Sequence, residues 1–171
     1  MEETVERAVA KGLLNIHNLA IGEGNYGIIF EIPGFPDLCG KYAKFHFDIR
    51  ELWRLEEAHK CELPVPKPFE RVPGTKTFLM ERIHGKNLEE LEHEGKFCGE
   101  VAEQIVLACK LFCSLFCHND LFPRNIMLRH PRVTASVITS GTPIIVDLER
   151  TIKGENEEWK GVQEWLERRV F

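Results

Sequence analysis

Apolar positions in the first half of the chain predict short strands around one helix. Residues 28–32 are mostly β-branched or aromatic, and Pro33-Gly34 directly after them indicates a turn. Residues 38–44 and 77–83 are similarly apolar and predict two further strands. Between them, apolar side chains at positions 52, 55 and 58 recur at helical spacing, and prolines at 64, 66 and 68 prevent the helix from continuing.

The second half of the chain carries two helical stripes and one apolar strand. The first stripe, within residues 100–117, consists of Val101, Ile105, Ala108, Cys109, Phe112 and Phe116. The second, within residues 157–171, consists of Trp159, Val162, Trp165, Leu166 and Val170. The run from Pro143 to Val146 predicts a buried strand. The fold class is therefore α+β.

Composition narrows the class of protein. The chain has 171 residues, 43% of them hydrophobic, without a low-complexity linker, which predicts a single compact domain over residues 1–171. A net charge of −5 without a basic cluster argues against nucleic-acid binding. The longest near-apolar run, residues 105–117, contains Lys110 and is shorter than the ~20 residues that cross a bilayer, so no membrane partner is expected.

The cysteines and the first residues of the chain indicate the redox state of the cellular compartment. There are six cysteines, and the chain begins Met-Glu-Glu-Thr, which is not a basic-then-apolar signal segment. We therefore expect a reducing compartment: the cytoplasm, or a host cytosol if the protein is a secreted effector.

One polar segment has the spacing of a catalytic loop. His118, Asp120 and Asn125 fit the pattern H-x-D-x-x-x-x-N, and the apolar strand that follows leads into Asp147. Carboxylate and amide oxygens suit a hard cation such as Mg²⁺. The alternative is an ordinary turn, because Asn, Asp and Pro gather in turns for local hydrogen-bonding reasons.

An upstream glycine motif fits G-x-G-x-x-G at Gly22, Gly24 and Gly27. Dinucleotide-binding folds share this pattern, but there a helix follows the glycines, whereas here a β-branched stretch follows. A strand-loop-strand hairpin that covers a nucleotide is predicted, with a plain glycine hairpin as the alternative.

These motifs resemble the protein kinase-like superfamily, which includes the Rio kinases and the aminoglycoside and choline phosphotransferases, over roughly residues 19–150. The resemblance implies a two-lobed fold, with an antiparallel-sheet upper lobe over residues 1–83 and a much reduced helical lower lobe over residues 84–171. It also implies ATP and Mg²⁺ as cofactors and an alcohol group as the phosphoryl acceptor.

By the same resemblance, Asp120 would position the acceptor hydroxyl, and Asn125 and Asp147 would bind Mg²⁺. Gly22, Gly24 and Gly27 would cover the phosphates. The backbone of Met80, Glu81 and Arg82 would bind adenine.

The phosphate-binding lysine has two candidates. Lys41 and Lys44 are an odd number of positions apart, so on a strand their side chains face opposite sides. We favour Lys41, with Lys44 as a solvated surface residue. The expected partner of Lys41 is Glu51, ahead of Glu56 and Glu57, because Glu51 lies at the front of the helix with Leu55 four residues further on. An exposed helix charge is the alternative reading for Glu51.

Departures from the family pattern shape the functional prediction. Asn119 stands where regulated kinases usually have an arginine that senses phosphorylation, so no such activation is expected. Leu148-Glu149 replaces Phe-Gly, and Phe122 replaces a lysine common in serine/threonine kinases. Little chain follows Asp147, which suggests that a protein partner completes the lower lobe.

Three functional classes remain open: an atypical serine/threonine protein kinase, which we favour, a small-molecule kinase, and a catalytically inactive module that binds and regulates a protein. Arg124, Arg129, His130 and Arg132 could meet an anionic substrate, or could solvate a surface hairpin.

Overall fold

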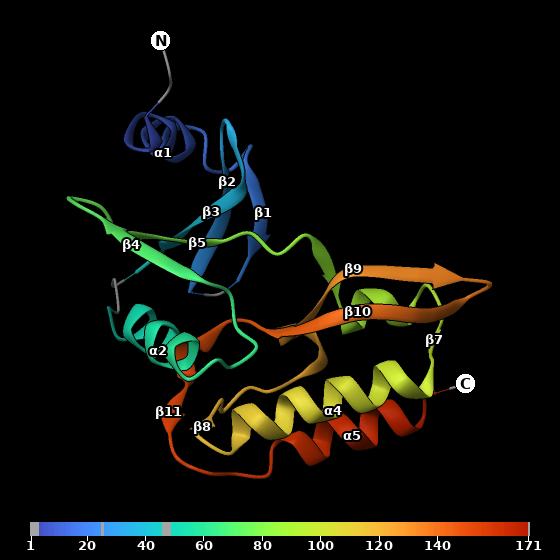
Figure 1. Cartoon of the computed structure of the whole chain (residues 1–171). Helices are drawn as coiled ribbons and strands as arrows, with labels where there is room; N and C mark the ends of the chain where they lie inside the picture. Colours follow the sequence, from blue (N-terminus) through green and yellow to red (C-terminus); the bar gives the residue numbers. More distant parts are fainter. Residues whose placement is uncertain (1–3, 25, 46–48, 171) are drawn as a thin grey trace. The chain divides into compact units, whose positions relative to one another are not determined.

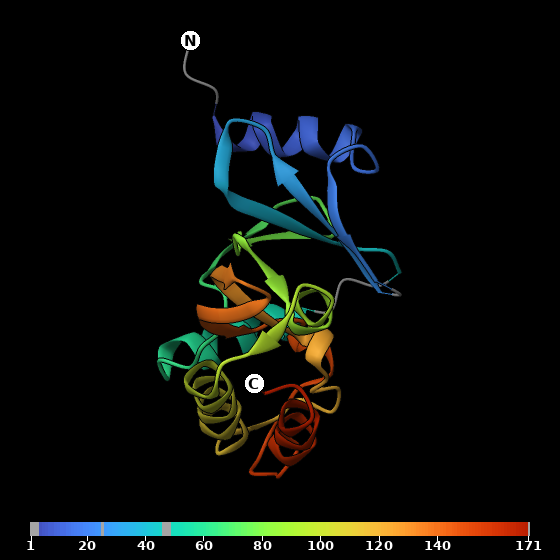
Figure 2. The ribbon, with the colours of Figure 1, turned by 90° about the vertical axis from the view of Figure 1, so that its right-hand side faces the viewer.

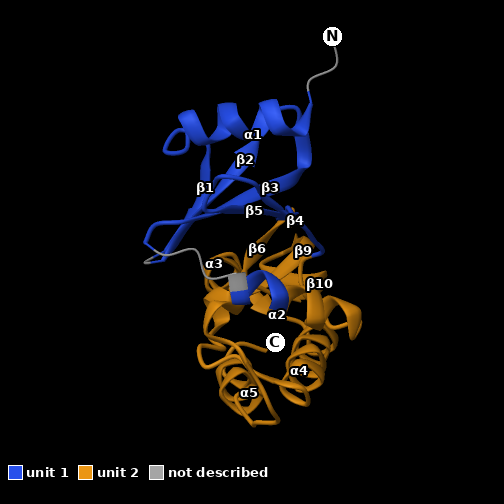
Figure 3. Cartoon of the chain, turned by 90° about the vertical axis from the view of Figure 1, so that its left-hand side faces the viewer, with its two compact units in different colours: residues 1–53, 67–82 blue, residues 54–66, 83–171 orange. Residues whose placement is uncertain are grey.

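The computed structural model describes residues 4–24, 26–45 and 49–170, and in this part of the chain two compact units are distinguished (Figure 3). The first comprises residues 1–53 and 67–82, and the second comprises residues 54–66 and 83–171. The second unit thus combines residues 54–66 with the chain from residue 83 onward, and the expected division into lobes over residues 1–83 and 84–171 stays a prediction.

The first unit is an antiparallel sheet with a helix on one face (Figures 1 and 2). The strand order is β1-β2-β3-β5-β4. The elements are α1 (Val5–Leu14), β1 (Ala20–Glu23), β2 (Gly27–Ile32), β3 (Phe35–Ala43), β4 (Pro68–Val72) and β5 (Thr77–Glu81). Helix α2 (Ile49–Lys60) begins in this unit, and its residues from Arg54 onward belong to the second.

Helix α1 is an element that the sequence analysis did not predict. Its buried residues, Ala8, Val9 and Gly12, face the sheet, and Ala8 and Val9 share a core cluster with Phe30. A Cβ atom on Gly12 would lie 2.7 Å from the Phe30 ring, so the helix approaches the sheet closely only because this position lacks a side chain.

Gly40 on β3 also lies against the Phe30 ring, from within the sheet. A Cβ atom there would lie 2.4 Å from the Phe30 ring, much closer than atoms can pack. Gly40 therefore makes room for Phe30, which is fully buried. This packing explains a glycine directly before Lys41.

The second unit combines a mixed sheet with helices. The sheet order is β6-β9-β10-β7, and β10 pairs with β9 antiparallel and with β7 in parallel. A separate ladder joins β11 to β8. The elements are β6 (Gly85–Asn87), α3 (Leu88–Glu92), β7 (Lys96–Phe97), α4 (Gly99–Cys113), β8 (Phe116–Cys117), η1 (Pro123–Asn125), β9 (Ile126–Thr134), β10 (Val137–Ile145), η2 (Leu148–Arg150), β11 (Ile152–Lys153) and α5 (Trp159–Glu167).

Helices α4 and α5 lie side by side in this unit (Figures 1 and 2). Both predicted stripes are present, but each helix is shorter than expected. Phe116 lies in strand β8 beyond the end of α4, and Val170 lies beyond α5 in a bridge to Phe97. Cys109, part of the predicted stripe, and Cys113 are both buried in α4.

The β9–β10 hairpin was not predicted as a pair of long strands. Its tip, Ala135 and Ser136, has positive φ angles of 48° and 62°, the backbone of a tight hairpin turn. Arg129, His130 and Arg132 lie along β9. Within the described residues, no helix is long and apolar enough to span a membrane.

Candidate functional site

Lys41 and Glu51 form a buried ion pair in the first unit. Strand β3 pairs with β2 so that Lys41 lies opposite Ile29, and α2 begins shortly afterwards with Glu51 in its first turn. Lys41 Nζ lies 2.6 Å from Glu51 Oε1. The two residues are only 8% and 9% exposed. Two opposite charges at this depth hold each other, because either one alone would be costly to bury.

Lys44 lies beyond the end of β3 at Ala43, so the strand period that was expected to separate the two lysines does not extend to it. Its Nζ atom lies 2.6 Å from Glu23 Oε1 and donates to the carbonyl of Gly24 at 2.8 Å. The hydrogen bond and charge of Lys44 lower the pKa of the exposed Glu23 carboxyl. Lys44 therefore contacts the glycine segment itself and differs from the solvated residue that we expected.

The glycine segment joins β1 to β2, and Asn25 within it lies outside the described residues. The Gly24 N–H donates to the Gly27 carbonyl at 3.0 Å, which closes the turn. A Cβ atom on Gly27 would lie 3.0 Å from the Tyr42 carbonyl, whereas at Gly24 it would meet nothing within 4 Å. Close packing therefore favours glycine at position 27, and the open space at Gly24 lets a ligand approach the backbone.

The predicted adenine-binding residues lie at the end of β5, where two of their N–H groups are already used. The Glu81 N–H donates to the Lys67 carbonyl at 2.8 Å, and the Arg82 N–H donates to the Asp37 carbonyl at 3.0 Å. Neither N–H can donate to a base while these bonds persist. That the backbone of Met80, Glu81 and Arg82 binds adenine stays a prediction, and these two bonds leave the role of N–H donor to another residue.

Ile83 is the next residue along. Within the described residues, its backbone N–H has no hydrogen-bond partner, while its neighbour His84 accepts from His130 N at 2.9 Å. The first open donor after β5 is thus at Ile83, which sequence reasoning missed because the pairing of neighbouring strands determines which groups remain open.

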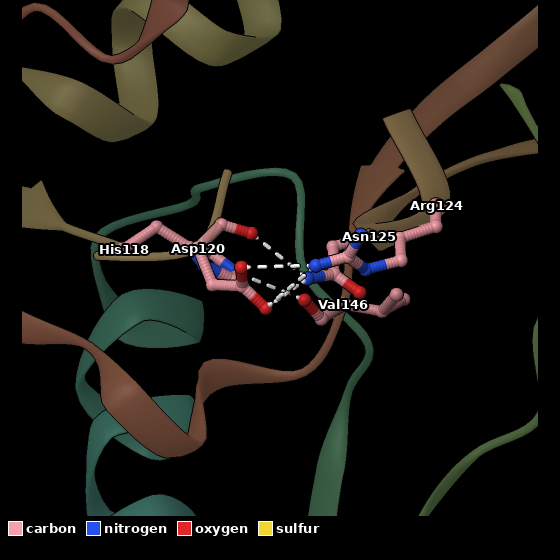
Figure 4. Close-up of polar contacts among 5 residues, drawn as sticks. All are labelled: His118, Asp120, Arg124, Asn125 and Val146. Carbon is pink, nitrogen blue, oxygen red and sulfur yellow. Dashed lines mark hydrogen bonds and ion pairs between the residues drawn. The ribbon is translucent and has the colours of Figure 1, made fainter. Parts of the chain in front are cut away.

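Asp120 lies in the loop before η1, where two side chains donate to its carboxylate (Figure 4). Arg124 Nη2 lies 3.1 Å from Oδ1 and 3.4 Å from Oδ2. Asn125 Nδ2 lies 2.8 Å from the Asp120 carbonyl and 3.2 Å from Oδ2. The Arg124 guanidinium also lies 4.7 Å from the centre of the exposed Phe122 ring. This cation, which the motif did not specify, is the main addition that the structure makes to the loop.

His118 supports the loop from within the core (Figure 4). Its Nε2 atom lies 2.9 Å from the Val146 carbonyl and donates to it, because a carbonyl only accepts. Its Nδ1 atom has no hydrogen-bond partner among the described residues. Burial lowers the pKa of His118, which favours the neutral ring. His118 is therefore a buried neutral imidazole that holds the Val146 carbonyl.

Asp147 directly follows Val146, the residue after the end of β10, which His118 and Asn125 hold. The Val146 N–H donates to the Asn125 carbonyl at 2.9 Å, and Asp147 itself is exposed and left-handed, with φ 61° and ψ 64°. Among the described residues, no three His, Cys, Asp or Glu side chains gather into a metal-binding group. The oxygen atoms of Asn125 and Asp147 still suit Mg²⁺, which usually takes one or two protein carboxylates and completes its shell with phosphates and water.

The segment after Asp147 is tied to two other elements. Asn119 Nδ2 donates to the Arg150 carbonyl at 2.9 Å, and Arg54 on α2 donates to the Glu149 carbonyl. Lys153 Nζ lies 2.6 Å from Glu57 Oε1. Glu57, weighed as a partner of Lys41, binds Lys153 instead.

Comparisons with known proteins identify the fold. No protein-family model and no curated protein matches the sequence. Among solved structures, the kinase domain of PF14_0431 is similar at 15% identity and TM-score 0.51, over 81% of this chain and 51% of that one. The Rio2 kinase of Chaetomium thermophilum, solved with ADP/Mg²⁺ and phosphoaspartate, is similar at 16% identity and TM-score 0.52, over 95% of this chain and 57% of that one.

This chain therefore has a protein kinase-like fold, as the resemblance implied. It spans little more than half the length of each of these two kinases. Both the α+β class and the antiparallel sheet of the first unit are confirmed.

Proposed function

We propose that the protein is a kinase that transfers the terminal phosphoryl group of ATP to an alcohol group with the help of Mg²⁺. The observation that carries the proposal is the buried Lys41–Glu51 pair at 2.6 Å, because no packing need explains two charges at that depth. A lysine held by a carboxylate in this way can present a fixed positive charge to phosphates.

In the proposed reaction, Lys41 orients the phosphates and Glu51 holds Lys41. Asp120 accepts a hydrogen bond from the acceptor hydroxyl, and Asn125 and Asp147 hold Mg²⁺. Gly22, Gly24 and Gly27 cover the phosphates, and the ion would neutralise charge as the phosphoryl group leaves. Phosphoryl transfer needs little covalent participation from the protein, so this small set of groups is sufficient.

For the acceptor, we favour serine or threonine of a protein, with small alcohols as the second candidate. The ordered segment after Asp147 supports an active enzyme over an inactive binding module. A protein partner that completes the second unit remains part of the proposal, in view of the length of the two kinases to which the chain is similar.

The first experiment is calorimetric titration of ATP with and without Mg²⁺. We expect Mg²⁺-dependent binding by the wild type and its loss in Asp147→Asn, while Glu155→Gln, an exposed carboxylate in the same unit, binds like the wild type. Melting temperatures of both variants establish that they are folded. Wild-type protein that binds no nucleotide would overturn the kinase proposal and favour the inactive module.

The acceptor is tested next with labelled ATP. Transfer to serine or threonine of a protein substrate would support the favoured class, and transfer to choline or an aminoglycoside would support the second. Asp120→Asn should abolish either transfer while ATP binding persists.

The Ile83 N–H is the backbone group that would donate to adenine, and a substitution at this position tests it. Ile83→Pro removes the open N–H, whereas Ile83→Ala keeps it and is the matched control. We expect ATP affinity to fall about tenfold in the proline variant only, which corresponds to one lost hydrogen bond. Equal affinities in both variants would exclude this N–H as the donor.

A further inference from the structure

Asp147 has a backbone conformation that needs outside support. Its φ of 61° and ψ of 64° lie in the left-handed region, which residues other than glycine occupy at a cost. Such a conformation persists only where the surrounding structure enforces it. Contacts that hold the chain before and after Asp147 can provide this support.

On the N-terminal side, the support comes from the loop at residues 118–125. Val146 donates its N–H to the Asn125 carbonyl at 2.9 Å, and its own carbonyl accepts from His118 Nε2 at 2.9 Å. Both polar groups of the residue before Asp147 are therefore bound to this loop.

On the C-terminal side, the same loop supplies Asn119. Its Nδ2 atom donates to the Arg150 carbonyl at 2.9 Å and lies 3.4 Å from the Cys117 carbonyl. Asn119 is itself left-handed, with φ 60°. Asparagine tolerates this backbone better than most residues and carries an amide donor, so it meets both requirements of the position.

We propose that Asn119 is a positioning residue for Asp147: by holding the Arg150 carbonyl, its side-chain amide keeps Asp147 in the conformation that binds Mg²⁺. The inference rests on the proposed function. Asp147 is thus bracketed by hydrogen bonds from one loop, at Val146 before it and at Arg150 after it. A neutral amide bound to a carbonyl performs this task in the unmodified chain, so no phosphate is required to order the segment.

The chain offers a closely matched control at Asn156. Asn156 Nδ2 donates to the Phe116 carbonyl at 2.7 Å, and its Oδ1 atom accepts from Glu158 N at 2.8 Å. Asn119→Asp and Asn156→Asp each replace one amide donor to one backbone carbonyl, and each adds one negative charge. Neither substitution changes the size of the side chain, and the Asn156 variant retains its acceptor oxygen.

The measurement is the Mg²⁺ concentration that half-saturates ADP binding, taken together with the melting temperature. We expect Asn119→Asp to raise this concentration about five- to tenfold, the effect of one lost hydrogen bond, and Asn156→Asp to leave it within about twofold. ADP binding without Mg²⁺ should be the same in all three proteins. Asn119→Gly, which keeps the left-handed backbone but lacks the amide, should behave like Asn119→Asp, which separates the lost bond from the added charge.

The outcomes are distinguishable. Equal Mg²⁺ requirements in the Asn119 and Asn156 variants would overturn the role of Asn119 and leave the kinase proposal intact. Loss of Mg²⁺-dependent binding after phosphatase treatment of the wild type would likewise overturn it, because a phosphate would then be needed. Wild-type protein without any Mg²⁺-dependent ADP binding would overturn the proposed function and this inference together.

Discussion

Each of the two units holds an ion pair among the candidate residues, and the two pairs differ in burial. Lys41 and Glu51 in the first unit have side chains that are 10% and 12% exposed, with 2.6 Å between Nζ and Oε1. Arg124 and Asp120 in the second unit have side chains that are 51% and 22% exposed, with 3.1 Å between Nη2 and Oδ1. One pair is shielded from water, and the other is open to it.

The difference indicates which charges are fixed and which are exchangeable. A buried lysine cannot leave its carboxylate without a large penalty, so Lys41 stays where strand β3 places it. A half-exposed arginine loses little by moving into water, so Arg124 can release Asp120. In the proposed reaction, the lysine that would bind the phosphates is thus preorganised, and the carboxylate that would position the acceptor hydroxyl stays accessible.

The largest effect is expected from breaking the buried pair. Lys41→Met leaves the Glu51 carboxyl buried without its cation, which should lower the free energy of unfolding by ~3–5 kcal/mol. The double variant Lys41→Met/Glu51→Met should recover most of this loss, because no lone charge remains buried. Urea unfolding at pH 7 measures both, and a double variant no more stable than Lys41→Met would show that the burial argument is wrong.

A smaller effect is expected beside Lys41, at Gly40. Gly40→Ala would place a Cβ atom 2.4 Å from the Phe30 ring and should destabilise the protein by ~1–3 kcal/mol through overpacking. Phe30→Leu in the same chain shortens the side chain and should restore part of the loss. Additive losses in urea unfolding would contradict a direct clash between the two positions.

In the second unit, the pH dependence of stability tests whether His118 is buried in its neutral form. Its pKa in the folded protein is lowered below the usual 6.5 by burial, so the unfolded chain binds the proton more readily. The neutral ring's contribution is therefore complete above about pH 6.5 and is lost as the pH falls below it. The slope from this group is at most ~1.4 kcal/mol per pH unit.

Urea unfolding at a series of pH values between 7.5 and 5.5 measures this slope. His118→Asn should flatten it relative to the wild type, since the other histidines are common to both proteins. Identical slopes would contradict the interpretation of His118 as a buried neutral imidazole.

The smallest effect is expected from the exposed pair. Arg124→Gln should change the free energy of unfolding by no more than ~1 kcal/mol, because water compensates for the lost attraction. Its unfolding curve, measured beside that of Lys41→Met, compares the two regions directly. A loss as large as that of Lys41→Met would mean that Arg124 is held as firmly as the buried lysine.

Much of the candidate site followed from local patterns in the sequence. The sequence favoured Lys41 over Lys44, and the structure places the two lysines in contact with different partners, Glu51 and Glu23. The spacing from His118 to Asn125 and the strand before Asp147 identified the second group of residues. The roles of these residues in catalysis stay predictions.

Other features of the site depended on which segments meet. Helix α1 has no motif, and it packs closely only because Gly12 lies directly against the Phe30 ring of the sheet. The engagement of the Glu81 and Arg82 N–H groups depends on carbonyls at Lys67 and Asp37.

The sequence by itself determined the motif order, the approximate limits of helices α2, α4 and α5 and of strands β2, β3 and β5, and the residue types of the site, because these depend on local periodicity and spacing. Only the tertiary structure decided which donors remain open at Ile83, which cation meets Asp120 and how Asn119 and His118 bracket Asp147. Each of those contacts is a hydrogen bond or ion pair whose geometry depends on backbone paths, and sequence spacing does not specify backbone paths.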